Sequence, residues 1–323
     1  MPVNAIEQLL DGATERTPLV SEDGKSGVPI ERVVIDGRRY VAKYMEVAGD
    51  WLARATGDFG LRQLHLWETG VYQRVPNCID PVVVGAARDG RRGVLLMRDI
   101  GEHLVPEGDE PISLEQHLGF LDHLAALHAA FWDWDEEFGL TPDGNRYAMF
   151  GPHVVSVEAK IGDSPIPPLM AKGWELLRGG DARSAAMVLS LLEDPGPLLV
   201  ALERTPRTFI HGDPKLGNLG SHPDGTTIAI DWAYAGPGES ACELAWYLSI
   251  NAARLPHPKE DAIAAFRAAL ERRGINTEPW WEAQLALALL GGFVQFGWEK
   301  ALGGPGDELD WWIDRATEAS RLL

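Results

Sequence analysis

The chain has 323 residues, of which 45% are hydrophobic and 24% are charged. This composition predicts a packed core, and the length suits one large or two medium domains. The formal net charge of −19 argues against nucleic acid as a partner, because phosphate binding needs clustered lysine and arginine. The same charge would suit a cationic ligand, although solubility alone also explains it.

The first hundred residues predict mainly strands. Pro29 to Val34 and Arg39 to Met45 are runs rich in β-branched and apolar residues, and they are split by Asp36-Gly37, a typical hairpin pair. A helix is expected next, over Leu61 to Arg74. A second strand pair is expected over Pro81 to Ala87 and Gly93 to Met97.

After Met97 the chain becomes polar and rich in glycine and proline up to Pro111, which indicates a linker. Ser113 to Gln116 has the form of a helix-opening capping box. Residues 167–204, broken near Asp194 to Pro197, and the last seventy residues predict further helices. We therefore expect the α+β class, with a strand-rich N-terminal lobe over 1–97, a hinge over 98–111 and a helical C-terminal lobe over 112–323.

The two cysteines, Cys78 and Cys242, lie far apart in the chain, which favours a reducing compartment and argues against a disulfide scaffold or a zinc site. The N-terminus is acidic and poor in apolar residues, unlike a signal peptide. The most apolar stretch, Leu285 to Trp298, is too short to span a bilayer. We expect a cytoplasmic protein that binds no membrane.

The segment from Thr208 to Leu248 carries the most chemistry. A short apolar strand ends at His211-Gly212-Asp213, which presents a carboxylate on a tight loop. Further on, Asp224-Gly225 predicts a hairpin turn. Counting outward from a two-residue turn places Asn218 opposite Asp231, with Cβ atoms about 4.5–5.5 Å apart.

One carboxylate and one amide carbonyl suit a hard cation. Mg²⁺ typically takes one or two protein carboxylates and completes its shell with water and nucleotide phosphates. Asn218 and Asp231 are therefore the predicted magnesium ligands. Asp213 remains as the group that orients an attacking hydroxyl and accepts its proton, as phosphoryl transfer requires.

The motifs HGDPKLGN (211–218) and IAIDW (228–232) resemble the aminoglycoside phosphotransferase and choline kinase family, distant relatives of the protein kinases. The resemblance implies a two-lobed protein-kinase-like fold, with a small antiparallel-sheet N-lobe that binds the nucleotide and a larger helical C-lobe that carries the catalytic loop and the acceptor site. It implies ATP and Mg²⁺ as cofactors. It assigns Asp213 as the catalytic base, Asn218 and Asp231 as magnesium ligands, and His211 as a brace of the loop.

The resemblance extends to the N-terminal half. Lys43 in YVAKYM is similar to the kinase lysine that binds the α- and β-phosphates, and Glu68 to the helix glutamate that pairs with that lysine. Ser26, in the segment DGKSG, is expected in the loop over the phosphates, although a surface turn would also explain this segment. The hinge that reads adenine is expected at Met97, Arg98 and Ile100.

Two residues depart from the family's usual pattern. Lys215, two residues after Asp213, is a position where protein kinases commonly carry lysine, and we expect it to neutralise charge on the moving phosphoryl group; an exposed loop lysine is the alternative. Glu243 in Glu-Leu-Ala stands where the family often has aspartate, and should be tolerated if it only braces the loop. His128 is expected to be a buried structural residue.

These features predict transfer of the γ-phosphoryl group of ATP to a hydroxyl of a small molecule, such as an aminoglycoside, amino sugar or amino alcohol. A nucleotide-binding sensor or scaffold without catalysis is the alternative, and a metal-dependent hydrolase would lack its usual histidine ligands. Aromatic and acidic clusters are candidates for the acceptor site, unless their tryptophans are core. These clusters are residues 132–137, Glu239, residues 280–282 and residues 310–312.

Overall fold

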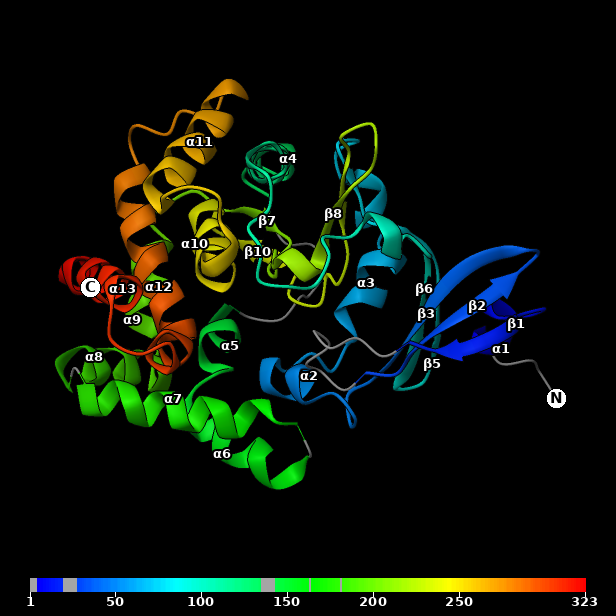
Figure 1. The fold of residues 1–323 in the computed structure, drawn as a ribbon, viewed down its shortest axis with the longest axis horizontal. Helices are drawn as coiled ribbons and strands as arrows, with labels where there is room; N and C mark the ends of the chain where they lie inside the picture. Colours follow the sequence, from blue (N-terminus) through cyan, green and yellow to red (C-terminus); the bar gives the residue numbers. More distant parts are fainter. Residues whose placement is uncertain (1–4, 20–27, 135–142, 163, 181) are drawn as a thin grey trace.

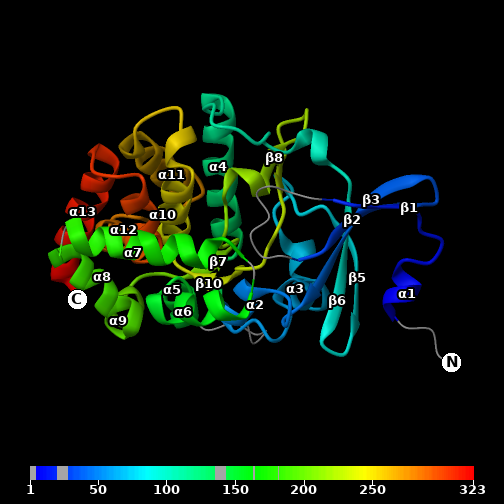
Figure 2. The same ribbon diagram turned by 60° about the horizontal axis from the view of Figure 1, so that its bottom comes forward.

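The computed structural model describes residues 5–19, 28–134, 143–162, 164–180 and 182–323. A five-stranded antiparallel sheet forms one end of the molecule, and most of the helices gather at the other end (Figures 1 and 2). The predicted α+β organisation is confirmed. The sheet has the order β1-β2-β3-β6-β5, and its strands are β1 (Thr14–Pro18), β2 (Ile30–Ile35), β3 (Arg38–Glu46), β5 (Val83–Asp89) and β6 (Arg92–Arg98).

The hairpin between β2 and β3 has the predicted two-residue turn. Ile35 pairs with Arg38, and the two residues between them, Asp36 and Gly37, have φ values of 49° and 73°. Two central residues with positive φ are the signature of the turn whose twist matches that of its flanking strands. The pairing fixes the register of β3 against its neighbours and so the direction of each β3 side chain.

Alternation along β3 produces two different faces. Ala42 packs with Val33 and Val94 in a cluster that the helix α1 (Ala5–Leu9) covers. Val41 and Met45 point to the opposite face, where they pack with residues of α3 (Arg62–Glu68). Successive strand side chains alternate between faces, so Lys43 shares the second face, which is directed toward the rest of the molecule.

The helix predicted over Leu61 to Arg74 is shorter than expected. α3 ends at Glu68, and a separate 3₁₀ turn covers Val71–Arg74. Gly70 between them has a φ of 74°, a left-handed conformation that glycine adopts freely and that interrupts a helix.

The helical part begins where the capping box predicts. The Ser113 side chain accepts a hydrogen bond of 3.1 Å from the Gln116 N–H at the start of α4 (Leu114–Ala130). Two helices, α10 (Ser240–Ile250) and α12 (Trp281–Leu302), are buried over most of their length. The other helices in this part are α5 (Asp143–Ala148), α6 (Pro152–Ile161), α7 (Ile166–Gly180), α8 (Ala182–Glu193), α9 (Gly196–Leu202), α11 (Lys259–Arg272) and α13 (Asp307–Ala319), while α2 (Trp51–Thr56) follows β3.

Short strands connect the two parts. β4 (Ile79–Asp80) pairs with β9 (Thr227–Ala229), which also pairs with β8 (Leu219–Ser221). A second pair consists of β7 (Thr208–Ile210) and β10 (Gly236–Gly238). Within the described ranges no single helix is long and apolar enough to cross a membrane, and one pair, Arg183–Glu193 with Gly196–Leu202, meets that test only together, with a bend of 82°.

Candidate active site

The hairpin that was predicted to align Asn218 with Asp231 has a different register. Leu219 pairs with Ala229, and Ile230 N–H donates to the carbonyl of Asn218 at 2.9 Å. The turn contains three residues, ending in Gly225 with a φ of 89°, the geometry of a type I turn closed by a left-handed residue. The predicted two-residue turn was therefore wrong, and Asn218 lies opposite Ile230.

Asp231 nevertheless turns toward the cleft. Its φ of 58° lies in the left-handed region, which is uncommon for a residue with a side chain and occurs often at functional sites. Asn218 and Asp231 both line one cavity. The backbone conformation of Asp231 thus achieves the proximity that the predicted register would have provided.

His211 braces the loop that follows β7, as predicted. Asp213 N–H donates to His211 Nδ1 at 3.2 Å, so the ring proton lies on Nε2, which is 2.9 Å from the carbonyl oxygen of Ile230 and donates to it. The ring is buried. It therefore ties the Asp213 loop to the end of the β8–β9 hairpin.

Glu243 on α10 holds the same loop from the other side. Its Oε1 accepts from Gly212 N–H at 2.6 Å, and its Oε2 contacts His128 Nε2 at 2.6 Å. Gly212 has a φ of 86°, and a Cβ there would lie 2.3 Å from the Tyr234 carbonyl oxygen. The loop needs glycine at this position, and Glu243 and His128 have the structural roles expected of them.

The Asp213 carboxylate is held at both oxygens. Oδ1 accepts from the indole N–H of Trp246 at 2.9 Å, and Oδ2 accepts from the side-chain amide of Asn218 at 2.9 Å. Burial raises the pKa of Asp213 above its ordinary value, against the opposing effect of the Lys215 charge. A carboxylate in this environment is oriented and poorly hydrated, as suits a group that accepts a proton.

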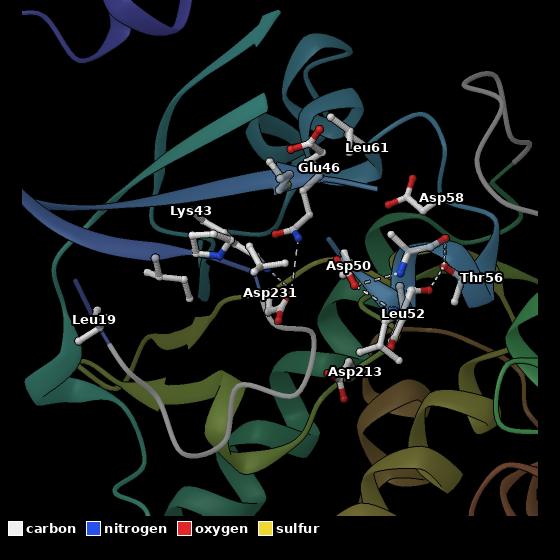
Figure 3. Close-up of a pocket in the computed structure, with 18 of the residues that line it drawn as sticks. Leu19, Lys43, Glu46, Asp50, Leu52, Thr56, Asp58, Leu61, Asp213 and Asp231 are labelled. Carbon is white, nitrogen blue, oxygen red and sulfur yellow. Dashed lines mark hydrogen bonds and ion pairs between the residues drawn. The ribbon is translucent and has the colours of Figure 1, made fainter. Parts of the chain in front are cut away.

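Lys43 and Asp231 meet across the cleft. Lys43 Nζ lies 2.7 Å from Asp231 Oδ1, and Figure 3 shows the two side chains together above Asp213. Burial alone would raise the pKa of Asp231, but the charge and hydrogen bond of Lys43 hold it below its ordinary value. The carboxylate is therefore ionised at neutral pH, and 34% of its side-chain surface remains exposed.

Glu68 does not pair with Lys43, and that predicted contact is wrong. Glu68 Oε1 and Oε2 instead accept from Arg88 at 2.9 and 3.1 Å. The residue of α3 that faces the cleft is Gln63, whose Nε2 lies 3.3 Å from Asp231 Oδ1. α3 is only seven residues long, and its packing directs Gln63, five residues before Glu68, toward the site.

Two cavities meet at these residues. The first, of about 410 Å³, is lined by Asp213 and by Asp50, Asp58 and Tyr234. The second, of about 620 Å³, is lined by Asn218 and by the predicted hinge residues Met97, Arg98 and Ile100. Lys43, Lys215 and Asp231 line both cavities, and both volumes fall in the usual range for small-molecule sites.

Not every predicted residue lies in the described structure or near the cavities. Ser26 lies outside the described residues, as do residues 135–137 of the first acceptor cluster. Elsewhere in these clusters, the Trp132 ring packs on the Trp280 ring with centroids 5.5 Å apart. Glu239 Oε1 lies 3.3 Å from Arg207 Nε. These contacts are outside the two cavities and show how such residues can serve packing.

The donor groups fit a magnesium ion shared with phosphates. Asn218 directs its amide nitrogen at Asp213, so its carbonyl oxygen is the atom suited to a cation. Both Lys43 and Gln63 contact Asp231 Oδ1, which leaves Oδ2 for a metal. Among the described residues no group of three His, Cys, Asp or Glu side chains could hold a metal, so a magnesium ion here would also need ligands from phosphates and water.

The molecule has an antiparallel-sheet lobe and a helical lobe, and a lysine, two aspartates and an asparagine line the cavities between them. These features define the two-lobed, protein-kinase-like class. The model of the phosphotransferase enzyme family matches residues 31–280, and the chain belongs to this family. The resemblance drawn from the motifs is thereby confirmed. No curated protein matches the chain in sequence.

Solved structures share the fold at low sequence identity. A choline kinase from Streptococcus pneumoniae is 13% identical, with a TM-score of 0.52 over 98% of this chain and 96% of that one. A microcompartment-associated aminopropanol kinase is 15% identical, with a TM-score of 0.53 over 97% of this chain and 94% of that one. At this level of identity the similarity establishes the fold, and the specific activity must be argued from the site.

Proposed function

We propose that this phosphotransferase uses ATP and Mg²⁺ and moves the γ-phosphoryl group to a hydroxyl of a small molecule. The observation that carries the proposal is the junction of the two cavities. Met97, Ile100 and Asn218 line only the second, Asp213 lines only the first, and Lys43, Lys215 and Asp231 line both. A nucleotide in the second cavity would direct its terminal phosphate toward an acceptor in the first.

In this proposal Lys43 binds the phosphates of the nucleotide and Lys215 neutralises charge on the group that is transferred. Asn218 and Asp231 would hold Mg²⁺, which supplies charge neutralisation on the phosphates when bound. Met97, Arg98 and Ile100 would contact the adenine through the hinge. Asp213 orients the acceptor hydroxyl and takes up its proton.

The first cavity has features that suit a cationic acceptor. Five carboxylates line it, against the two lysines Lys43 and Lys215, and they belong to Glu46, Asp50, Asp58, Asp213 and Asp231. Figure 3 shows Asp50 and Asp58 on the side of the cavity formed by α2 and the turn after it. An excess of negative charge in a cleft raises the local concentration of cations. An aminoglycoside, an amino sugar or an amino alcohol would bring both the cation and the hydroxyl.

The two structures described above are named as kinases of amino alcohols, choline in one case and aminopropanol in the other. We take amino alcohols as the first class to test because the acidic cavity and these neighbours agree. Whether the acceptor is an amino alcohol or a larger aminoglycoside depends on the size of ligand that the first cavity can hold.

The test is a screen of hydroxylated amines for ADP release, run with Mg²⁺ and with excess chelator. The expected result is ADP that forms only with Mg²⁺ and one acceptor class, in equal amount to a phosphorylated product found by mass spectrometry. Free phosphate without a phosphorylated acceptor would indicate a hydrolase instead. Nucleotide binding without turnover across the panel would favour a silent sensor.

A further inference from the structure

One face of α10 contacts the Asp213 loop at two points. Glu243 binds Gly212 N–H, and Trp246, three residues later, donates its indole N–H to Asp213 Oδ1 at 2.9 Å. Residues three apart lie on the same face of a helix. Glu243 fixes the backbone of the loop, and Trp246 contacts the reactive side chain itself.

The hydrogen bond from Trp246 to Asp213 can form in only one direction. An indole N–H can donate a hydrogen bond but cannot accept one. The opposite carboxylate oxygen receives the amide of Asn218 at 2.9 Å. Two donors on different oxygens define the plane of a carboxylate, while each oxygen keeps a further lone pair that can accept from an incoming hydroxyl.

Trp246 is itself held in place. It is buried, and its ring contacts Phe296 edge-on with centroids 4.6 Å apart, and Tyr234 with centroids 5.7 Å apart. Aromatic pairs in such arrangements add to the burial of their surfaces. The donor therefore belongs to a buried aromatic cluster that packs against the loop.

We infer that Trp246 is a positioning residue for the transfer reaction, which orients the Asp213 carboxylate toward the first cavity through its indole N–H. The inference rests on the proposed role of Asp213. It explains why a tryptophan, and not only an apolar side chain, stands at this buried position. Misplacing a reacting group by about 1 Å can lower a rate by about 10²-fold.

A tryptophan with the same kind of hydrogen bond, whose indole N–H donates to a backbone carbonyl and not to Asp213, provides a matched control. Trp174 is buried in the same lobe, and its indole N–H donates to the backbone carbonyl of Phe150 at 2.9 Å. Trp174→Phe and Trp246→Phe each remove one buried indole N–H and a similar volume. Only the second frees the Asp213 carboxylate.

The kinetic experiment compares both variants with the parent protein. Trp246→Phe should lower kcat by about 10- to 100-fold with the KM for ATP within about twofold, whereas Trp174→Phe should leave kcat within about twofold. In an Asp213→Ala background, Trp246→Phe should cause no further loss, because residues that act as a unit are not additive. Equal effects of the two substitutions on kcat would overturn the inference.

A measurement without ligands covers the case in which Trp246→Phe does not fold. In ¹H–¹⁵N spectra, Asp213→Ala should shift the Trp246 indole resonance and speed its hydrogen exchange, and should leave the Trp174 indole unchanged. An unchanged Trp246 resonance would overturn the inference whatever the activity. A parent protein that shows this coupling but phosphorylates nothing would instead refute the proposed function.

Discussion

Lys43 Nζ lies 2.7 Å from Asp231 Oδ1, although 188 residues separate the two in the chain. The contact joins β3 of the sheet lobe to the segment that follows β9. It places a buried ammonium against a carboxylate that keeps 34% of its side-chain surface exposed to the cleft. Both residues of the pair line both cavities.

The first prediction concerns Lys43. Lys43→Met should lower kcat/KM for ATP by about 10²–10³-fold, because it removes a fixed charge from the proposed path of the phosphates. Arg39→Met is the matched control, since Arg39 lies on the same strand but its side chain is 70% exposed, and it should leave kcat/KM within about twofold. Steady-state kinetics with varied ATP checks both, and a similar loss in the two variants would contradict the assignment.

A second substitution separates chemistry from binding. Asp213→Ala should lower kcat by about 10²–10⁴-fold, the usual range for a general base, while the Kd for ATP stays nearly unchanged. Calorimetric titration gives the Kd, and the product assay gives kcat. Loss of ATP affinity with normal turnover at saturation would assign Asp213 to nucleotide binding instead.

The third prediction distinguishes Gln63 from Glu68. Gln63→Leu should weaken binding of ATP with Mg²⁺ by about tenfold, because it removes a buried donor to Asp231. Glu68→Gln should change it by less than about twofold, because Glu68 pairs with Arg88 near the surface, and such pairs contribute about 0–1 kcal/mol. If Glu68→Gln is the more damaging change, Glu68 moves to the lysine when nucleotide binds.

The fourth prediction concerns the pH dependence of stability. Burial would raise the pKa of Glu243, but its hydrogen bonds with His128 and with Gly212 N–H hold the pKa below the ordinary value of 4.5. A carboxyl with a lower pKa in the folded than in the unfolded state stabilises the fold above about pH 4.5, and this contribution is lost as the pH falls through the folded pKa.

Glu243→Gln should therefore lower the free energy of unfolding by about 1–3 kcal/mol at pH 7, and the difference from the parent protein should shrink below pH 4.5. Urea unfolding at several pH values measures it. Glu115→Gln, on an exposed position of α4, serves as the control. A difference that stays constant down to pH 3 would show that the charge of Glu243 is not what stabilises the loop.

Local signals in the sequence were sufficient for several of these elements. The Asp36-Gly37 turn and the Ser113 cap depend on a few neighbouring residues, and the structure has both. The motifs around Asp213 predicted that two aspartates and an asparagine lie near one another, and the resemblance of YVAKYM to the kinase pattern added Lys43. These predictions were possible because each of the residues concerned lies in a short motif of a few neighbouring positions.

Other features depended on packing between distant segments. The Asp224-Gly225 pair allows both a two-residue and a three-residue turn, and the structure has the longer one, which shifts the register by one residue. Whether Gln63 or Glu68 faces the cleft depends on how α3 packs against the sheet. Trp246 and Asp213 are 33 residues apart in the chain. Their contact depends on how α10 packs against the Asp213 loop, so no local sequence pattern predicts it.

The most direct test of the site is nucleotide binding measured by calorimetry with and without Mg²⁺ in the parent protein and in Asp231→Ala. If Asp231 holds the ion beside the phosphates, Mg²⁺ should tighten binding to the parent protein, and the variant should lose most of that gain, about tenfold or about 1.4 kcal/mol. An equal gain from Mg²⁺ in both proteins would show that the ion binds elsewhere, and the assignment of Asn218 and Asp231 would be wrong.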